Sequence, residues 1–327
     1  MKRSLLLVLI AAPLFAQPVV KAIPANIQWG AYAAGAKPVL TIKSGETVRI
    51  ETASGNPAVL GPLGAPEDDN LRELKEIYAQ IKERGPGPHI LTGPVAVEGA
   101  KPGDVLQVDI LSVEPRSTYG YNCQSPVAGI LPYDFPVSRT TLIKVDLQAR
   151  IAPMSPGVRI PLRPFFGSMG LAPASGRVNS APPGAHAGNL DNKELVAGTT
   201  LYIPVQHEGA LFSTGDGHLI QGDGEVDLCG LESPLAGVFR LTVRKDMKLL
   251  WPRAETPTHV IAMGFHETLD EAARRATREM VEYLVTVKGM TPQDAYSLCS
   301  MAVDLRITQV VDGVKGVHAM VPKALFK

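Results

Sequence analysis

Hydrophobic and polar residues alternate over several short segments of the chain, which is the pattern of half-buried β-strands. Residues 39–43 and 47–51 are rich in β-branched residues and flank the turn Ser44-Gly45-Glu46. This arrangement predicts a β-hairpin. From residue 119 to 184 the chain is dense in proline and glycine, which favours short β segments and structured loops over long helices.

Three further alternating segments predict longer strands, at residues 105–111, 201–205 and 238–243. Pro204 lies in the second of them. Because proline has no backbone N–H to donate to a ladder, we expect this segment to be an edge strand.

Helical periodicity is confined to three segments. Residues 70–84 repeat apolar side chains at helical spacing, with Asp69 or Asn70 as the cap. Residues 269–284 carry one apolar stripe, and Thr268 with Glu271 predicts a capping box. Thr291-Pro292 predicts the start of another helix, which continues to about Asp304. Residues 306–311 and 316–320 then predict a closing hairpin.

These elements predict a mainly β fold with a sandwich- or barrel-like body and a C-terminal α+β segment. The composition changes near Pro257. We therefore expect a β-rich catalytic body over residues 17–256 and a C-terminal segment over residues 257–327 that packs on it.

The first 16 residues have the pattern of a signal peptide. A basic start is followed by a short apolar run and by Ala16. A membrane anchor is the alternative, but the run is short for a spanning helix. We expect a secreted or periplasmic protein without stable membrane insertion after the signal is removed.

Charge indicates which class of ligand the protein can bind, and the cysteines indicate which covalent or metal links to expect. The chain of 327 residues has 32 Lys+Arg and 32 Asp+Glu, a balance that disfavours nucleic acid and fits a small-molecule partner. Its three cysteines, Cys123, Cys229 and Cys299, are far apart and odd in number. They form no disulfide framework or zinc motif, and core thiols are expected rather than a single bridge.

The most informative stretch contains two Gly-Asp-Gly triplets, in Gly215-Asp216-Gly217-His218 and Gln221-Gly222-Asp223-Gly224-Glu225. Two Asx turns on a surface hairpin would be the structural alternative. Carboxylate and imidazole groups on such turns suit a divalent cation, and a catalytic zinc lowers the pKa of bound water. Asp216 and His218 share one face of an extended chain, and Asp191 is a third carboxylate on another glycine turn. Calcium is the alternative metal, although the order of ligands does not fit an EF-hand.

Other reactive side chains give weaker signals. His89 precedes the Leu91-Thr92-Gly93-Pro94 turn and is a candidate ligand or substrate contact, and His186 lies near Asp191. Cys229 has no adjacent base in the sequence that would activate a nucleophilic thiol. The chain lacks G-x-S-x-G and a Walker or Rossmann signature in the required context.

The motifs taken in order resemble the acetamidase/formamidase family. The resemblance rests on the stretch from Gly209 to Glu232, on Gly188-Asn189-Leu190-Asp191, on His89 to Pro94, and on tail elements such as Val303-Asp304-Leu305-Arg306-Ile307. It implies hydrolysis of a short carboxamide at a divalent-metal site in a homo-oligomer, most simply a dimer. By position, it implies the metal-side residues Asp191, Asp216 and His218, the catalytic residues Glu225 and Glu232, and the substrate-binding or orienting residues Gln221, Asp223 and His89.

Two segments depart from the family pattern. Asp227-Leu228-Cys229-Gly230 and Ala185-His186-Ala187 differ from the usual residues beside the site, which bears on substrate size. Two alternatives therefore remain beside the linear amidase. One is an amidohydrolase of a cyclic amide or another C–N bond, and the other is a non-catalytic exported β-rich protein that binds a carbohydrate or cell-wall ligand.

Overall fold

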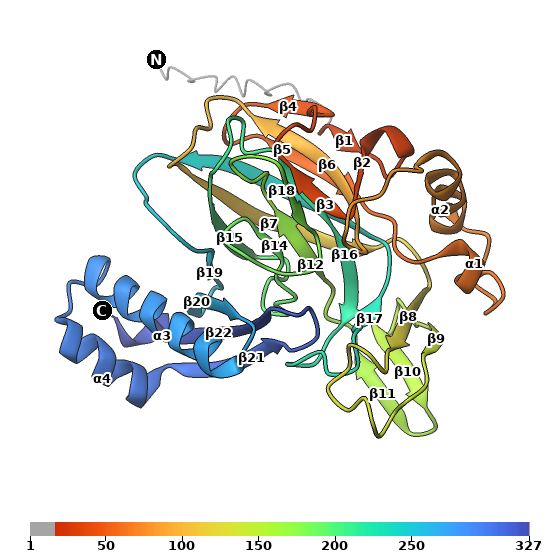
Figure 1. Ribbon diagram of the computed structural model, residues 1–327. Helices are drawn as coiled ribbons and strands as arrows, with labels where there is room; N and C mark the ends of the chain where they lie inside the picture. Colours follow the sequence, from red (N-terminus) through yellow and green to blue (C-terminus); the bar gives the residue numbers. More distant parts are fainter. Residues whose placement is uncertain (1–16, 327) are drawn as a thin grey trace, which may run out of the picture.

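The computed structural model describes residues 17–326, so the predicted signal peptide at residues 1–16 lies outside the described part of the chain. The described residues form a β-rich body with helices at its two ends (Figure 1). Among residues 17–326, no helix combines the length and hydrophobicity needed to cross a membrane. The mainly β fold with a helix-and-strand C-terminal segment is therefore confirmed.

Most strands belong to two nine-stranded sheets. In spatial order, the first contains β1 (Val19–Val20), β5 (Thr47–Glu51), β18 (Leu235–Arg244), β7 (Val105–Pro115), β15 (Thr199–Pro204), β19 (Arg253–Glu255), β20 (His259–His266), β22 (Lys315–Pro322) and β21 (Asp304–Gln309). The second contains β14 (Ala187–Asn189), β12 (Phe165–Gly170), β16 (Phe212–Ile220), β17 (Leu231–Glu232), β8 (Tyr119–Gln124) and β9 (Arg139–Lys144), with β6 (Ile90–Val97) joining β16 to β2 (Ile27–Trp29) and β4 (Leu40–Ile42).

The remaining elements are short ribbons and helices. The ribbons are β3 (Ala31–Ala33) with β13 (Arg177–Asn179), and β10 (Ile151–Ser155) with β11 (Val158–Pro161). The helices are α1 (Pro57–Leu60), α2 (Asp69–Gln80), α3 (Leu269–Thr286) and α4 (Pro292–Ala302), with 3₁₀ turns at Pro24–Asn26 and Lys323–Leu325.

The main core lies between the two sheets. Phe239 on β18 contacts Phe166 on β12 and Phe212 on β16, with ring centroids 5.4 and 5.5 Å apart. All three side chains are fully buried. Such aromatic contacts across facing sheets are typical of a β-sandwich core.

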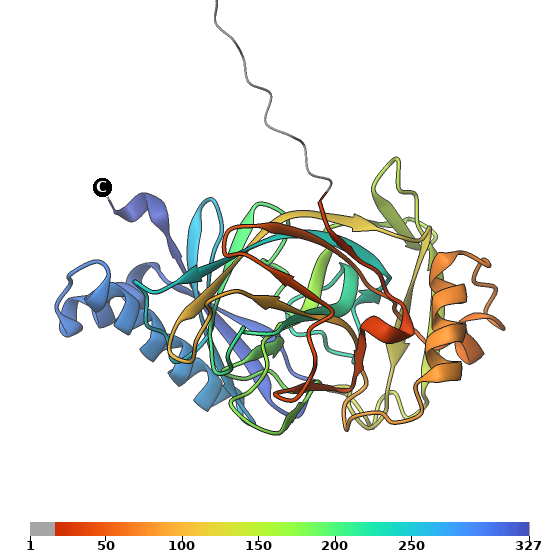
Figure 2. The same cartoon turned by 90° about the horizontal axis from the view of Figure 1, so that it is seen from above.

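The C-terminal segment continues the first sheet. Strand β20 pairs with β19 and β22, so hydrogen bonding runs across residue 257 without a break. Helix α3 covers these strands, and it lies so close to Gly264 that a Cβ there would meet the backbone of Ala272 and Ala276. Both views place α3 and α4 at the end of the body opposite to α1 and α2 (Figures 1 and 2). The predicted hairpin of β21 and β22 is confirmed.

The predicted hairpin at residues 39–51 is wrong. Strand β4 pairs with β6 in the second sheet, whereas β5 pairs with β1 and β18 in the first. Gly45 has φ 91°, so the predicted turn exists. This turn carries the chain from the second sheet to the first, because β4 pairs with β6 and β5 pairs with β18 rather than with each other.

Two other local predictions are also wrong. Strand β15 is interior, because β7 and β19 flank it, but β19 pairs only with residues 200–202 and leaves Pro204 uncovered. Thr268 is the N-cap of α3 without a side-chain cap bond, since its hydroxyl pairs with His266 Nδ1. Helix α2 is confirmed, but its cap is Asp68, which accepts from Leu71 N at 3.0 Å, and it ends at Gln80.

Candidate active site

A pocket of about 310 Å³ contains most of the candidate residues from the sequence. Its ionisable end consists of seven side chains from four parts of the fold, all of which except His218 line the pocket directly: His89 before β6, Asp191 after β14, Asp216 on β16, His218 on β16, Glu225 in the β16–β17 loop, Glu232 on β17, and Asp312 between β21 and β22. We use the name ionisable end for this set. The rest of the pocket is lined mainly by apolar side chains.

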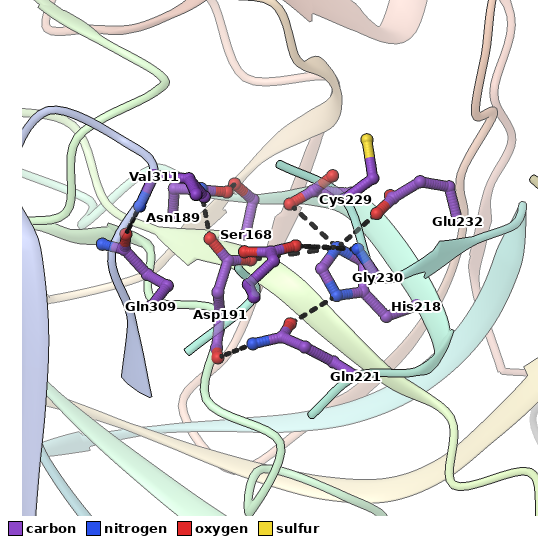
Figure 3. A network of polar contacts seen from close by, with 12 residues as sticks. Ser168, Asn189, Asp191, His218, Gln221, Cys229, Gly230, Glu232, Gln309 and Val311 are labelled. Atoms are coloured by element: carbon purple, nitrogen blue, oxygen red, sulfur yellow. Dashed lines mark hydrogen bonds and ion pairs between the residues drawn. The ribbon is translucent and has the colours of Figure 1, made fainter. Parts of the chain in front are cut away.

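His218 lies at the centre of the ionisable end (Figure 3). Its Nε2 is 3.2 Å from Glu232 Oε1 and 3.5 Å from Asp216 Oδ2. The same nitrogen is 3.9 Å from Asp191 Oδ1 and from Glu225 Oε1. Four carboxylates therefore surround one imidazole nitrogen, and the alternation on β16 places Asp216 and His218 on one face as predicted.

Gln221 fixes the orientation of His218. Its Nε2 donates to the backbone oxygen of Asp191 at 2.7 Å, so its Oε1 is the acceptor 2.7 Å from His218 Nδ1. His218 Nδ1 then donates to Gln221, and Nε2 faces the carboxylates. A histidine held in this way by its other nitrogen is suited to metal binding.

The backbone is strained where the carboxylates leave it. Asp191, Asp216 and Glu225 have φ of 46°, 54° and 45°, a left-handed region that few non-glycine residues adopt. Such conformations cluster at functional sites because the surrounding structure must enforce them. Gly167 on β12 makes room, since a Cβ there would collide with the carboxylates of Asp191 and Asp216.

A second network reaches the ionisable end from β12 and β14. Ser168 Oγ donates to Asn189 Oδ1 at 2.7 Å, which directs Asn189 Nδ2 toward Asp191 Oδ2 at 2.5 Å (Figure 3). The same Asn189 Nδ2 lies 3.1 Å from Asp312 Oδ2. Only one oxygen of Asp191 is satisfied in this way. Its other oxygen, Oδ1, is buried and has no hydrogen-bond partner.

Burial and mutual repulsion disfavour negative charge at the ionisable end. Burial raises the pKa of Asp191 and of Glu225 well above their ordinary values, and it raises the pKa of Asp312 to about 6. Burial would also raise the pKa of Asp216, but the positive charges of His89 and His218 outweigh it and lower that pKa. For His218, burial lowers the pKa, but the charges of Glu232 and Asp216 raise it well above the ordinary value. These carboxylates cannot all ionise together without added positive charge.

The donor set fits a divalent cation. Two groups share His218, namely Asp191 with Glu225 and Asp216 with Glu232, and the ligand atoms of each group lie within 4.8 Å of one another. The unpartnered Asp191 Oδ1 and His218 Nε2, which faces four carboxylates, are atoms that a cation would bind, with the cation replacing the imidazole proton at Nε2. Buried carboxylates are stable when they are paired or coordinate a metal.

The three residues predicted to bind or orient the substrate lie at different distances from the pocket. His89 lines the pocket, donates from Nδ1 to Ser180 O at 2.9 Å, and directs Nε2 toward Asp216 Oδ2 at 3.8 Å. Gln221 acts on His218 from behind the pocket. Asp223 is exposed and pairs with Lys193, so the structure does not bring it to the cluster.

His186 also lies outside the cluster. It is buried, and its ring contacts Tyr32 with centroids 5.2 Å apart. Its position beside Asp191 in sequence therefore does not bring it into either of the two ligand groups.

The prediction of free core thiols is wrong for two of the three cysteines. Cys123 on β8 and Cys229 form a disulfide across 106 residues, and both line the pocket. Cys299 is free. The bridge follows from the packing of β8 against the loop after Glu225, a long-range contact that local spacing cannot reveal. It also removes Cys229 as a candidate nucleophile.

Asp312 is the site residue that sequence reasoning missed. The Asp312-Gly313 pair has the pattern of an ordinary turn, and nothing local indicates that it enters the pocket. Gln309 shapes this turn by accepting from the backbone of Val311 at 2.9 Å and of Asp312 at 3.2 Å. The same hairpin supports the Glu225 loop, because Gly224 N donates to Thr308 O at 3.1 Å.

Comparison with known proteins identifies the family of the chain. The profile of the acetamidase/formamidase family matches residues 32–179 and 174–327. A formamidase from Methylophilus methylotrophus is 26% identical over 351 residues, covering 84% of this chain and 83% of that protein. The structure of a predicted acetamidase/formamidase from Thermoanaerobacter tengcongensis has a TM-score of 0.81 at 26% identity, covering 94% of this chain and 96% of that one. An acetamidase from Bacillus halodurans has a TM-score of 0.80 at 29% identity, covering 94% and 98%.

Proposed function

The chain belongs to the acetamidase/formamidase family, whose members hydrolyse the carbon–nitrogen bond of linear amides, and we propose that it is an exported, metal-dependent amidase. It converts a short carboxamide and water to a carboxylate and ammonia. The observation that carries metal dependence is the buried group of carboxylates around His218 Nε2, with the unpartnered Asp191 Oδ1 among them.

Asp191, Asp216 and His218 hold the cation in this proposal, which takes one aspartate from each of the two groups that share His218 and leaves Glu225 and Glu232 for the proton transfer and the substrate. Zinc suits the mixture of an imidazole nitrogen and carboxylate oxygens, and calcium, which takes oxygen ligands, is the alternative. When bound, the cation lowers the pKa of water and polarises the amide carbonyl. Gln221 keeps His218 Nε2 directed into the site, and Asn189 holds Asp191 Oδ2 so that Oδ1 remains free.

Glu225 is the proposed proton carrier. The backbone N–H of Gly230 donates to Glu225 Oε1 at 2.9 Å and holds the carboxylate at the pocket surface. From there it accepts the proton of the attacking water and delivers it to the amide nitrogen, which leaves as ammonia. Glu232, 3.2 Å from His218 Nε2, and His89 complete the polar surface that orients the carboxamide.

Export is supported by two independent features. The first 16 residues have the charge and hydrophobic pattern of a signal peptide. The Cys123–Cys229 disulfide is typical of an oxidising compartment. N-terminal sequencing of the protein recovered from the periplasm or medium should begin at Gln17, whereas an intact N-terminus in the cytoplasm would contradict export.

We further propose a homodimer. Strand β21 is an edge of the first sheet and exposes Leu305 and Ile307, and Tyr296 and Met301 are exposed on the neighbouring α4. An uncovered apolar edge is a surface that proteins usually bury against a partner. Light scattering on the purified protein should give twice the chain mass, and a monomer would contradict the proposal.

The test of the function is ammonia release from formamide, acetamide and propionamide by the purified mature protein. Each amide is assayed before and after chelation. Release that chelation abolishes is the expected result. No release from any linear amide by folded, metal-loaded protein would contradict the amidase assignment and favour a cyclic amide or a binding role.

A further inference from the structure

We propose that the preferred substrate is a primary carboxamide with an apolar acyl group larger than acetyl. Its hydrocarbon part contacts the apolar wall of the pocket, which we define as Val59, Leu60, Tyr78, Ile90, Tyr121 and Leu228. This inference rests on the proposed hydrolysis at the ionisable end and adds the substrate class.

The size of the pocket is the first argument. Its volume of about 310 Å³ corresponds to roughly ten water molecules at ~30 Å³ each. Formamide or acetamide replaces only a few of these waters and leaves most of the apolar wall wet. Pockets of this size usually hold larger ligands and bury most of their surface.

The second argument is the position of the wall relative to the chemistry. His218, Glu232 and Tyr121 stand opposite one another on the adjacent strands β16, β17 and β8. Residues opposite one another in a sheet project from the same face, so the apolar wall begins directly beside the ionisable end. The acyl group of an amide held at the ionisable end can therefore lie against the apolar wall.

The two tyrosine hydroxyls of the wall and the neighbouring Asn56 oxygen already have hydrogen-bond partners. Tyr121 Oη and Ser54 Oγ share a hydrogen bond at 3.2 Å, and Tyr78 Oη donates to Gly55 O at 3.3 Å. Asn56 Oδ1 accepts from Ala58 N at 3.0 Å as the cap of α1. A polar acyl group that loses its water against these engaged groups gains no new hydrogen bond from them, which costs binding energy.

Charge excludes an anionic acyl group in the same way. The residues that line the pocket include no lysine or arginine, while five of them are the carboxylates of the ionisable end. A carboxylate on the acyl group would lie along the apolar wall, where no lysine or arginine is present to receive it. The remaining class is an uncharged, apolar acyl group.

The wall is also preformed. Gly55 has φ 112°, and Leu60 and Tyr121 pack so closely against it that a Cβ would overlap the Leu60 side chain. Leu60 is buried, whereas Val59 lines the pocket from the outer side of α1 and is partly exposed. A wall held in this way contacts a long acyl chain without first having to order itself, which preserves the binding energy of the contact.

The test is kcat/KM for a series of primary amides from formamide to valeramide, with the monoamide of succinate as the charged match for valeramide. Each buried methylene should raise kcat/KM about fourfold, and the succinate monoamide should be poorer than valeramide. A series in which formamide or acetamide is best, or in which kcat/KM is flat, overturns the inference while the amidase function stands. No ammonia from any member would instead overturn the proposed function.

The variant Val59→Trp distinguishes loss of acyl-group binding at the apolar wall from a general loss of activity. The larger side chain fills the pocket at an exposed position, so kcat/KM for valeramide should fall about tenfold or more while that for formamide stays within about twofold. Leu63→Trp is the matched control, because Leu63 is exposed nearby but does not line the pocket. Equal loss for both amides in Val59→Trp would overturn the assignment of the wall.

Discussion

The two ends of the pocket are built in opposite ways. The ionisable end lies on or beside strands of the second sheet, with Asp312 added from the β21–β22 turn, and hydrogen bonds orient His218 and one oxygen of Asp191 while Asp191 Oδ1 has no partner. The apolar wall combines side chains from helices α1 and α2, from strands β6 and β8 and from the disulfide-linked loop, and its two tyrosine hydroxyls already have hydrogen-bond partners. Hydrogen bonds and ion pairs determine the structure of the ionisable end, whereas packing of side chains determines the shape of the apolar wall.

This difference separates chemistry from selectivity. A change at the ionisable end alters groups that every amide must meet, so it should reduce turnover for all substrates. A change at the apolar wall should alter which amides bind or how stable the wall is, and leave the reaction itself intact. The predictions below test this separation, beginning with the largest effect.

Glu225→Gln should lower kcat for every amide by about 10³-fold, because general acid–base catalysis contributes 10² to 10⁴. The change keeps the size of the side chain and an oxygen that accepts from Gly230 N. Steady-state ammonia release is the measurement. Asp223→Asn is the matched control, since it neutralises an exposed acid two residues away and should retain near wild-type kcat.

The metal content of Glu225→Gln shows whether a loss of turnover comes from the missing proton carrier or from loss of the metal. Glu225→Gln should retain the bound metal, because the proposed ligands are Asp191, Asp216 and His218. Turnover close to wild type in Glu225→Gln would remove this residue from the mechanism.

Removing the disulfide should mainly affect stability. The bridge closes a loop of 106 residues, so the double variant Cys123→Ser/Cys229→Ser should lose about 4 kcal/mol of the free energy of unfolding. Urea denaturation of the oxidised wild type and the variant measures the difference. Cys299→Ser, which changes the free cysteine, should lose less than about 1 kcal/mol. Equal stability of the double variant and wild type would contradict a structural role for the bridge.

His186 should make the protein sensitive to acid without taking part in the chemistry. Burial lowers its pKa from 6.5 to about 4. The unfolded chain therefore binds the proton at a higher pH than the folded chain, and the folded state should lose about 2 kcal/mol between pH 7 and pH 5 from this residue. His186→Gln should lose that part of the acid sensitivity. Urea denaturation at the two pH values tests this, and an unchanged difference between them would contradict it.

The smallest effect concerns the helix that supports the apolar wall. Asp68→Ala removes the cap of α2 and should cost about 1 kcal/mol of stability. Thr268→Ala is the matched control, because Thr268 occupies the N-cap of α3 without a side-chain cap bond and should cost less than about 0.5 kcal/mol. Thermal unfolding of the two variants gives the comparison. A larger loss in Thr268→Ala would reverse our interpretation of the two helix starts.

The sequence predicted the ionisable end better than the wall for a physical reason. Asp216, His218 and Glu225 lie within one short stretch, and their glycine turns and two-residue spacing are local properties of the chain. Asp312 and the Cys123–Cys229 bridge reach the pocket only through long-range packing of the C-terminal hairpin and β8. No spacing pattern contains that information.

Strand pairing in the fold likewise depends on long-range contacts that local sequence patterns do not contain. The strands at residues 40–42 and 47–51 were predictable from alternation, but their partners were not, because each pairs in a different sheet with a strand far away in sequence. The N-cap of α4 at Thr291 was predictable, since it depends on the next three residues alone. The bond of Thr268 with His266 shows how a competing local partner defeats such a pattern.

The central claim is that the ionisable end holds a divalent cation on which amide hydrolysis depends. The most direct measurement removes metal from the purified protein by chelation and then follows ammonia release and bound metal together as zinc is added back. We predict loss of activity on chelation and recovery that saturates at a fixed ratio of metal to chain. Full turnover by demonstrably metal-free protein would contradict the account.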